Sequence, residues 1–209
     1  MAEHKGLPIQ TFADRMAWEK WLAAHGASSP GVWMKFAKKT ARKPTIARPD
    51  AIEAALCVGW IDGQLDKFDD TYWLVRFTPR GPKSRWSQNN RDTALRLIAA
   101  GKMKAAGQAE IDHAKADGRW DAAYASASKA EVPDDLKKAL DAKPKAKAFF
   151  AALNGANRYA ILYRLHHAKT EKTRAARIEK FVAMLARGET LHPRKASTSA
   201  VTARKSKRG

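Results

Sequence analysis

The sequence predicts an α+β protein: a small, mostly antiparallel sheet with packed helices, followed by an all-α C-terminal unit and a disordered basic tail. Strand-like patterns occur only in the first eighty residues, helical spacing dominates the rest, and the last residues contain no large apolar anchor. With 209 residues, 44% of them hydrophobic, the chain can bury a substantial core. We predict an α+β domain over residues 1–125, a linker over 126–131, a helical domain over 132–191 and a tail over 192–209.

Three segments near the N-terminus have strand patterns. Val32, Met34 and Phe36 alternate with the residues between them, and this period of two predicts a strand over residues 31–37. Residues 60–68 and 71–78 are rich in aromatic and β-branched side chains around an acidic turn, which is typical of a β-hairpin. Together these three strands form the predicted sheet.

Apolar residues at helical spacing predict four helices in the same part of the chain. Thr11 with Asp14 resembles a short capping box, so the first helix is expected over residues 12–25. Glycines end the expected helices, because glycine commonly follows the last helical residue. The other three helices run from Pro49 to Gly59, from Trp86 to Gly101 and from Met103 to Gly118.

The C-terminal half has a different pattern. Residues 121–131 have small side chains and little periodicity, which indicates a domain boundary. Pro133 begins a series of four short apolar stripes, the clearest of which includes Ile178 and Leu185. Short helices of this kind bury a core only by packing together, so we expect a four-helix unit.

Composition restricts the class of protein. The formal net charge is +19, which attracts anionic partners without specificity. The chain has no apolar run long enough to span a membrane, and Glu3 lies where a secretory signal would be basic, so we expect a cytoplasmic protein. The one cysteine, Cys57, is expected to be a small buried residue. No metal site and no cofactor are predicted.

Two parts of the chain resemble a known family. The first is the run CVGWIDGQLDKF…YWLVRFTPRGPKSRWSQNN, from Cys57 to Asn90, and the second is the segment from Val132 to Leu185. Both resemble the bacteriocin-protection, YdeI/OmpD-associated (OmdA) family, and the resemblance extends over roughly residues 8–190. It implies a part in protection against bacteriocins and cationic antimicrobial peptides, without an established reaction.

A dense group of polar and aromatic residues suggests a ligand site. Pairing of the hairpin strands is expected to bring Asp62 near Arg76. Ser84 or Ser87 is expected to cap the following helix, whose free N–H groups, with a partly exposed Arg80 nearby, would bind an anion. The alternative is that the same residues fill the margin of a core. The candidate ligand-binding residues are Trp60, Asp62, Arg76, Arg80, Ser84, Trp86, Ser87 and Asn90.

Three functions follow from these patterns. The leading hypothesis is a noncatalytic stress protein that binds a small or anionic ligand and contributes to antimicrobial peptide tolerance. The second is nonspecific nucleic-acid binding through the tail, by Arg194, Lys195, Arg204, Lys205, Lys207 and Arg208. The third is an enzyme of unrecognised type that uses Asp62 with Arg76 or Arg80. No catalytic residue is assigned, because the chain has no GxSxG, P-loop or GxGxxG motif.

Overall fold

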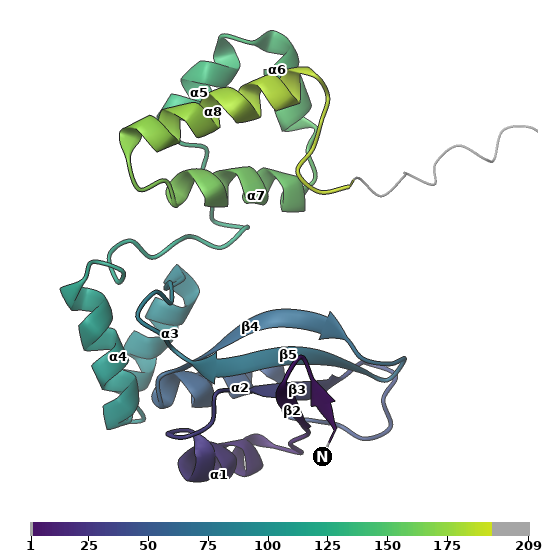
Figure 1. Ribbon diagram of the computed structural model, residues 1–209, viewed down its shortest axis with the longest axis vertical. Helices are drawn as coiled ribbons and strands as arrows, with labels where there is room; N and C mark the ends of the chain where they lie inside the picture. Colours follow the sequence, from purple (N-terminus) through teal and green to yellow (C-terminus); the bar gives the residue numbers. More distant parts are fainter. Residues whose placement is uncertain (1, 194–209) are drawn as a thin grey trace, which may run out of the picture. The chain divides into compact units, whose positions relative to one another are not determined.

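The computed structural model describes residues 2–193, which form two compact units that divide between Tyr124 and Ala125. The first unit combines a sheet with four helices, and the second consists of four helices (Figure 1). The predicted α+β class and the helical C-terminal unit are therefore confirmed. The role of residues 126–131 as a linker stays a prediction.

The first unit is organised around a five-stranded sheet with the order β1-β2-β3-β5-β4. β2 and β3 run parallel, and the other neighbours are antiparallel. The three predicted strands are present as β3, β4 and β5, each within a residue or so of its expected ends. The strands are β1 (Glu3–His4), β2 (Leu7–Gln10), β3 (Val32–Ala37), β4 (Trp60–Lys67) and β5 (Tyr72–Pro79).

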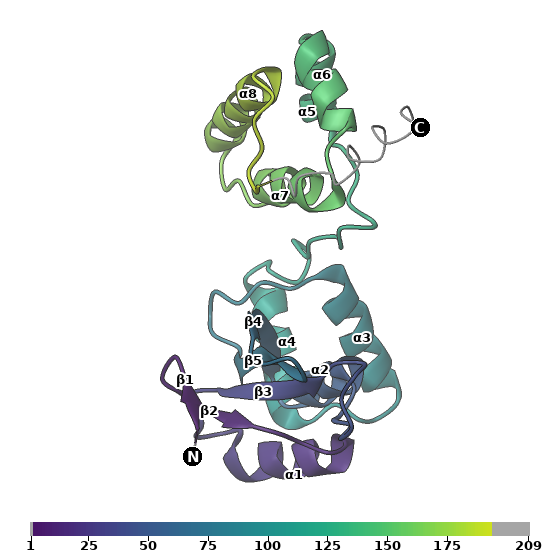
Figure 2. The same cartoon turned by 90° about the vertical axis from the view of Figure 1, so that its right-hand side faces the viewer.

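The sequence patterns did not reveal the N-terminal hairpin of β1 and β2, which lies beside β3 (Figure 2). Its turn consists of Lys5 and Gly6, both with positive φ (48° and 75°), as a type I′ turn requires. His4 Nε2 lies 3.0 Å from Asp66 Oδ2, and Lys5 Nζ donates to the same oxygen at 2.7 Å. These contacts connect the hairpin, at one edge of the sheet, to β4 at the other edge.

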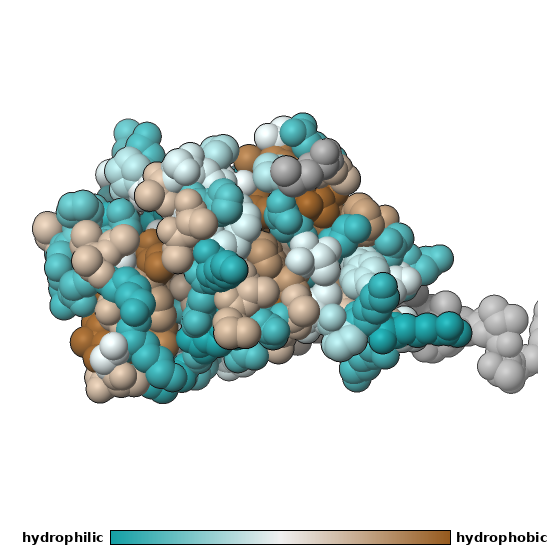
Figure 3. All heavy atoms as spheres, turned by 90° about the horizontal axis from the view of Figure 1, so that it is seen from below, coloured by the Kyte–Doolittle hydropathy of each residue, from teal (hydrophilic) through white to brown (hydrophobic). Residues whose placement is uncertain are grey.

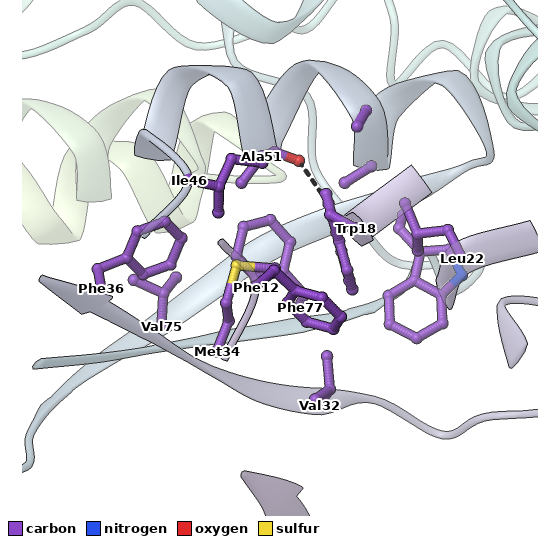
Figure 4. Packing of buried hydrophobic residues seen from close by; sticks show 13 residues of the cluster. Phe12, Trp18, Leu22, Val32, Met34, Phe36, Ile46, Ala51, Val75 and Phe77 are labelled. Atoms are coloured by element: carbon purple, nitrogen blue, oxygen red, sulfur yellow. Dashed lines mark hydrogen bonds between the residues drawn. The ribbon is translucent and has the colours of Figure 1, made fainter. Parts of the chain in front are cut away.

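One face of the sheet is covered by α1 (Arg15–His25) and α2 (Arg48–Cys57). Alternate strand residues, including Val75 and Phe77, point into this core, where Trp18 Nε1 donates to the carbonyl of Ala51 at 3.0 Å (Figure 4). Helix α1 begins later than predicted, because the side chain of Asp14 caps it by accepting from the N–H of Ala17.

A second apolar cluster lies around the C-terminal end of α2. Both α3 (Gln88–Ala99) and α4 (Ala105–Ala116) pack against α2, and Cys57 is buried in this cluster. Gly107 allows the close approach of α4, because a β-carbon there would lie 2.4 Å from the carbonyl oxygen of Cys57. This cluster also contains Trp86 and Trp120.

In the second unit α8 packs against the other three helices around one apolar core (Figure 1). The four helices are α5 (Asp134–Asp141), α6 (Pro144–Ala151), α7 (Gly155–His166) and α8 (Glu171–Ala186). Beyond α8, the chain returns to α7, where the buried side chain of Asn157 bonds to the backbone of His192. The tail predicted from residue 192 therefore begins too early, because His192 is part of the folded unit.

The helices of residues 2–193 include none with the length and hydropathy that a membrane span requires. Figure 3 shows the molecule from below, where hydrophobic residues form separate patches among hydrophilic ones. The six tail residues predicted to bind nucleic acid, from Arg194 to Arg208, lie outside the described residues.

Candidate functional site

A β-bulge in the hairpin separates two of the predicted site residues. Near the turn, Leu65 pairs with Val75, and this register would place Asp62 opposite Thr78, on the same face as Arg76. The register shifts between Asp62 and Leu65, so that Asp62 instead lies opposite Phe77. Because a shift of one residue moves a side chain to the other face, Asp62 and Arg76 lie on opposite faces of the sheet. The expectation that they come together is wrong.

The two residues have different surroundings. Asp62 accepts a hydrogen bond from Nη2 of Arg48, the first residue of α2, at 2.5 Å. Arg76 is exposed, on the face that also carries Trp33. The structure therefore provides no Asp62–Arg76 pair of the kind that the enzyme hypothesis requires.

Trp60 and Ser84 have structural partners. Trp60 is buried in the core beneath α1, and its Nε1 donates to the carbonyl of Gly26 at 3.0 Å. Ser84 closes a local turn, because its Oγ accepts from the N–H of Gly81 at 2.9 Å.

Ser87 is the N-cap of α3, and it is one of the two residues predicted for that role. Its Oγ accepts from the N–H of Asn90 at 3.1 Å. The N–H of Gln88 donates to the carbonyl of Tyr124 at 2.8 Å. Two of the donors expected to bind an anion at this helix end are thus already bonded within the chain, and the helix end by itself is a weaker site than predicted.

Arg80 lies deeper than predicted. Its side chain was expected to be partly exposed, but the residue is only 6% exposed. The guanidinium carbon lies 3.6 Å from the centre of the Trp86 ring, a cation–π contact, and Nη1 donates to the carbonyl of Arg85 at 3.2 Å. Sequence reasoning missed the cover over this site, which comes from residues 119–124, remote in the chain.

Residues 119–124 contact Ser84 and Trp86, which lie in the loop after Arg80. The Trp120 ring meets the Trp86 ring edge-to-face at 4.9 Å. The N–H of Tyr124 donates to the carbonyl of Trp86 at 3.1 Å, and Nη1 of Arg119 donates to the carbonyl of Ser84 at 2.8 Å. A lone tryptophan after the helix-ending Gly118 was the one sequence signal for this contact.

Three buried N–H groups gather where Arg80 meets Trp86. Nε and Nη2 of Arg80 and Nε1 of Trp86 have no hydrogen-bond acceptor among the described residues. Buried donors are almost always paired, and each unpaired one costs about 1–3 kcal/mol, more when it is charged. Trp33 and the half-buried Arg48 each have one such nitrogen. The Arg80–Trp86 cluster stands out because its three donors lie close together.

The electrostatics of Arg80 are those of a buried cation. Burial lowers the pKa of its guanidinium to about 10, a change opposed by the negative charge of Glu110 and reinforced by Arg119. The group is still protonated at neutral pH. No carboxylate among residues 2–193 forms an ion pair with it. The cluster therefore presents positive charge and unpaired donors, which suit an oxyanion.

Comparison with known proteins finds two segments of the chain that match different family models. Residues 129–188 match the family model described as bacteriocin-protection, YdeI or OmpD-associated (OmdA), which confirms the predicted resemblance for this segment. Residues 10–110 match a separate model, described as a domain of unknown function (DUF8412). The motifs between Cys57 and Asn90 thus fall within the second model. No curated protein and no solved structure gives a significant match to the chain.

Proposed function

We propose that this protein contributes to tolerance of bacteriocins or cationic antimicrobial peptides, and does so by binding a small oxyanion at Arg80. The proposal starts from the match of residues 129–188 to the bacteriocin-protection, YdeI or OmpD-associated family model. The family match supports the first half of this proposal. The Arg80–Trp86 cluster supports the second half.

The observation that carries the ligand assignment is the group of three unpaired N–H donors. A phosphate or carboxylate offers several acceptor oxygens to a planar guanidinium, and such charge-assisted hydrogen bonds are roughly twice as strong as neutral ones. The ring of Trp86 holds the guanidinium in place, and hydrogen bonds from Arg119 and Tyr124 fix the backbone of Ser84 and Trp86. Such preorganisation favours binding.

The proposed protection is indirect and noncatalytic. A chain of net charge +19 repels cationic peptides, so it does not trap them by electrostatics. The described cluster supplies a cation and donors to a ligand. We therefore assign it binding rather than bond-breaking chemistry, in a cytoplasmic protein whose ligand-bound form supports tolerance.

The test compares Arg80→Met with Lys83→Met, a change of the same kind at an exposed neighbour. Melting temperatures are measured with inorganic phosphate, sulfate or acetate at matched ionic strength. At a concentration 100 times the Kd, a ligand that binds only the folded state stabilises it by about 2.7 kcal/mol. We expect this stabilisation in the wild type and in Lys83→Met, and its loss in Arg80→Met.

Arg80→Met should remain folded, because methionine fills much of the same space and removes two buried donors that lack partners. Survival of cells under cationic peptide stress is then compared for the same variants. A folded Arg80→Met protein that keeps the full anion-induced stabilisation would contradict the ligand assignment. A variant that loses anion binding yet protects cells fully would show that tolerance does not depend on the bound anion.

A further inference from the structure

A groove of about 830 Å³ lies in the first unit, between α1, α2 and the connection from α3 to α4. Its volume is within the range of small-molecule pockets, about 300–1,000 Å³. Leu22 and Ala23 of α1 form one wall, and Ala54 and Val58 form the other. The groove shares no lining residue with the Arg80–Trp86 cluster.

Some of the charged side chains that line the groove are paired with opposite charges, and others are not. At one end, Arg15 is bonded to Glu19 at 2.6 Å and to Glu53 at 3.2 Å, so its charge is neutralised. On the connection from α3 to α4, Lys102 and Lys104 are exposed and form the cationic end of the groove, and neither ammonium group forms an ion pair with any residue from 2 to 193. The groove therefore has an apolar wall and one cationic end.

We propose that this groove binds a free aliphatic carboxylate, with its hydrocarbon chain along the apolar wall and its carboxylate at Lys102 and Lys104. Burial of each methylene group contributes about 0.8 kcal/mol, so a chain of several carbons supplies the affinity and the lysines supply the orientation. The lining residues include no aromatic ring to stack on a nucleobase. A second anionic group on the ligand is disfavoured, because Glu19 also lines the groove.

The single cysteine of the chain provides a local readout. Cys57 lines the groove, is 7% exposed, and has a pKa raised mainly by burial, so it is a thiol rather than a thiolate at neutral pH. Its alkylation is therefore slow and depends on access through the groove. A bound hydrocarbon chain should slow it further.

The first experiment uses the full chain and dodecanoate below its micellar concentration. Calorimetry measures the affinity, and mass spectrometry follows the alkylation of Cys57 by iodoacetamide. We expect saturable binding at one site, with Cys57 protected over the same concentration range. Binding only at micellar concentrations, or saturable binding that leaves Cys57 unprotected, would overturn the proposal, as would preference for anionic vesicles over the free carboxylate.

Two pairs of variants locate the ligand. Ala23→Leu places bulk in the groove at an exposed helix position, and Ala24→Leu places the same bulk one residue away, outside the lining. Lys102→Glu/Lys104→Glu reverses the cationic end, and Lys20→Glu/Lys39→Glu makes the same change in net charge elsewhere. We expect the affinity to fall by about tenfold or more, ~1.4 kcal/mol, in the first member of each pair.

The controls should bind like the wild type, and so should Arg80→Met, because the two sites are separate. Equal affinity in Ala23→Leu and Ala24→Leu, with both variants folded by melting temperature, would refute this location of the site. Failure of the oxyanion proposal would leave these results unchanged, so the two proposals can be judged independently.

Discussion

The side-chain amide of Asn157 holds the backbone of His192 through two hydrogen bonds. The amide nitrogen donates to the carbonyl of His192 at 3.2 Å, and the amide oxygen accepts from its N–H at 2.8 Å. Asn157 is only 1% exposed, so His192 supplies partners to a buried polar group. The folded C-terminal unit thus extends beyond α8 to the segment that contains His192.

This contact predicts where the chain can be shortened. Removal of residues 194–209 should leave the melting temperature essentially unchanged, because the sequence there has no large apolar anchor. Removal of residues 192–209 should destabilise the protein by about 1–3 kcal/mol, since buried Asn157 loses both hydrogen bonds to His192 and its side-chain oxygen loses the donor that His192 supplies. Calorimetric melting of the three chains checks this difference, and equal melting temperatures for the two truncations would contradict it.

Two glycine substitutions should have opposite effects on stability. Gly107→Ala should destabilise the fold by about 1–3 kcal/mol, because its β-carbon would lie 2.4 Å from the carbonyl oxygen of Cys57. Gly155→Ala, in the first turn of α7, meets no atom within 4 Å and should stabilise by about 0.4–1 kcal/mol. Urea unfolding of both variants measures the two changes. A Gly107→Ala protein as stable as the wild type would show that α4 moves away freely.

Asp66 gives the stability of the first unit a pH dependence. Hydrogen bonds from Lys5, then His4 and the Lys67 backbone hold the pKa of this carboxyl well below its usual range. A carboxyl with a lower pKa in the folded chain stabilises the fold above its unfolded pKa, about 3.9, and loses this contribution as the pH falls further. Asp66→Asn should therefore lower the melting temperature at pH 7 but make little difference at the lowest pH at which the protein folds.

The control for this prediction is Asp70→Asn, which removes an exposed acid in the turn between β4 and β5. The melting temperature of each variant is measured as a function of pH. A constant offset between Asp66→Asn and the wild type at every pH would mean that the ion pairs with the hairpin do not stabilise it.

The basic tail carries a separate prediction, made from its sequence alone. If its six basic residues contact about six phosphates, the slope of log K against log salt for DNA or RNA should be near −5, with little sequence preference. Fluorescence anisotropy over a salt series measures this slope. Deletion of residues 194–209 should abolish most of the binding, and an unchanged slope after deletion would place the binding surface on residues 2–193.

Limited proteolysis tests the proposed linker at residues 126–131. Lys129 is exposed and lies outside the helices, at the start of the second unit, so trypsin should cut there early. Mass spectrometry should then find two fragments that resist further digestion. Cleavage within α3 or α7 before any cut at Lys129 would contradict a flexible connection between two independently folded units.

The sequence predicted the secondary-structure elements more accurately than the contacts between them. The alternation at Val32, Met34 and Phe36 identified β3, and the aromatic and β-branched side chains around an acidic turn identified both strands of the β4–β5 hairpin. The N-terminal hairpin escaped notice because its strands have two and four residues, too few for a period to be visible, although Lys5–Gly6 is an acceptable type I′ turn.

The candidate site was less predictable, for two physical reasons. The bulge after Asp62 moves that carboxylate to the opposite face of the sheet, and no pattern of apolar residues marks a one-residue insertion. The Trp86 ring that stacks on Arg80 packs in turn against Trp120, which is 34 positions further along the chain. Local patterns identify a residue's element and face, but not the segment that later covers it.

The N-terminal hairpin also has a consequence for folding during synthesis. The ribosome releases β1 and β2 before the rest of the sheet, but β2 pairs with β3, and the carboxylate that binds His4 is 62 positions further along the chain. Until β3 emerges, the nascent hairpin has an unpaired strand edge, which is open to pairing with other chains. The hairpin is therefore made before the strands that secure it, and the speed of translation from β2 to β3 sets how long that edge stays open.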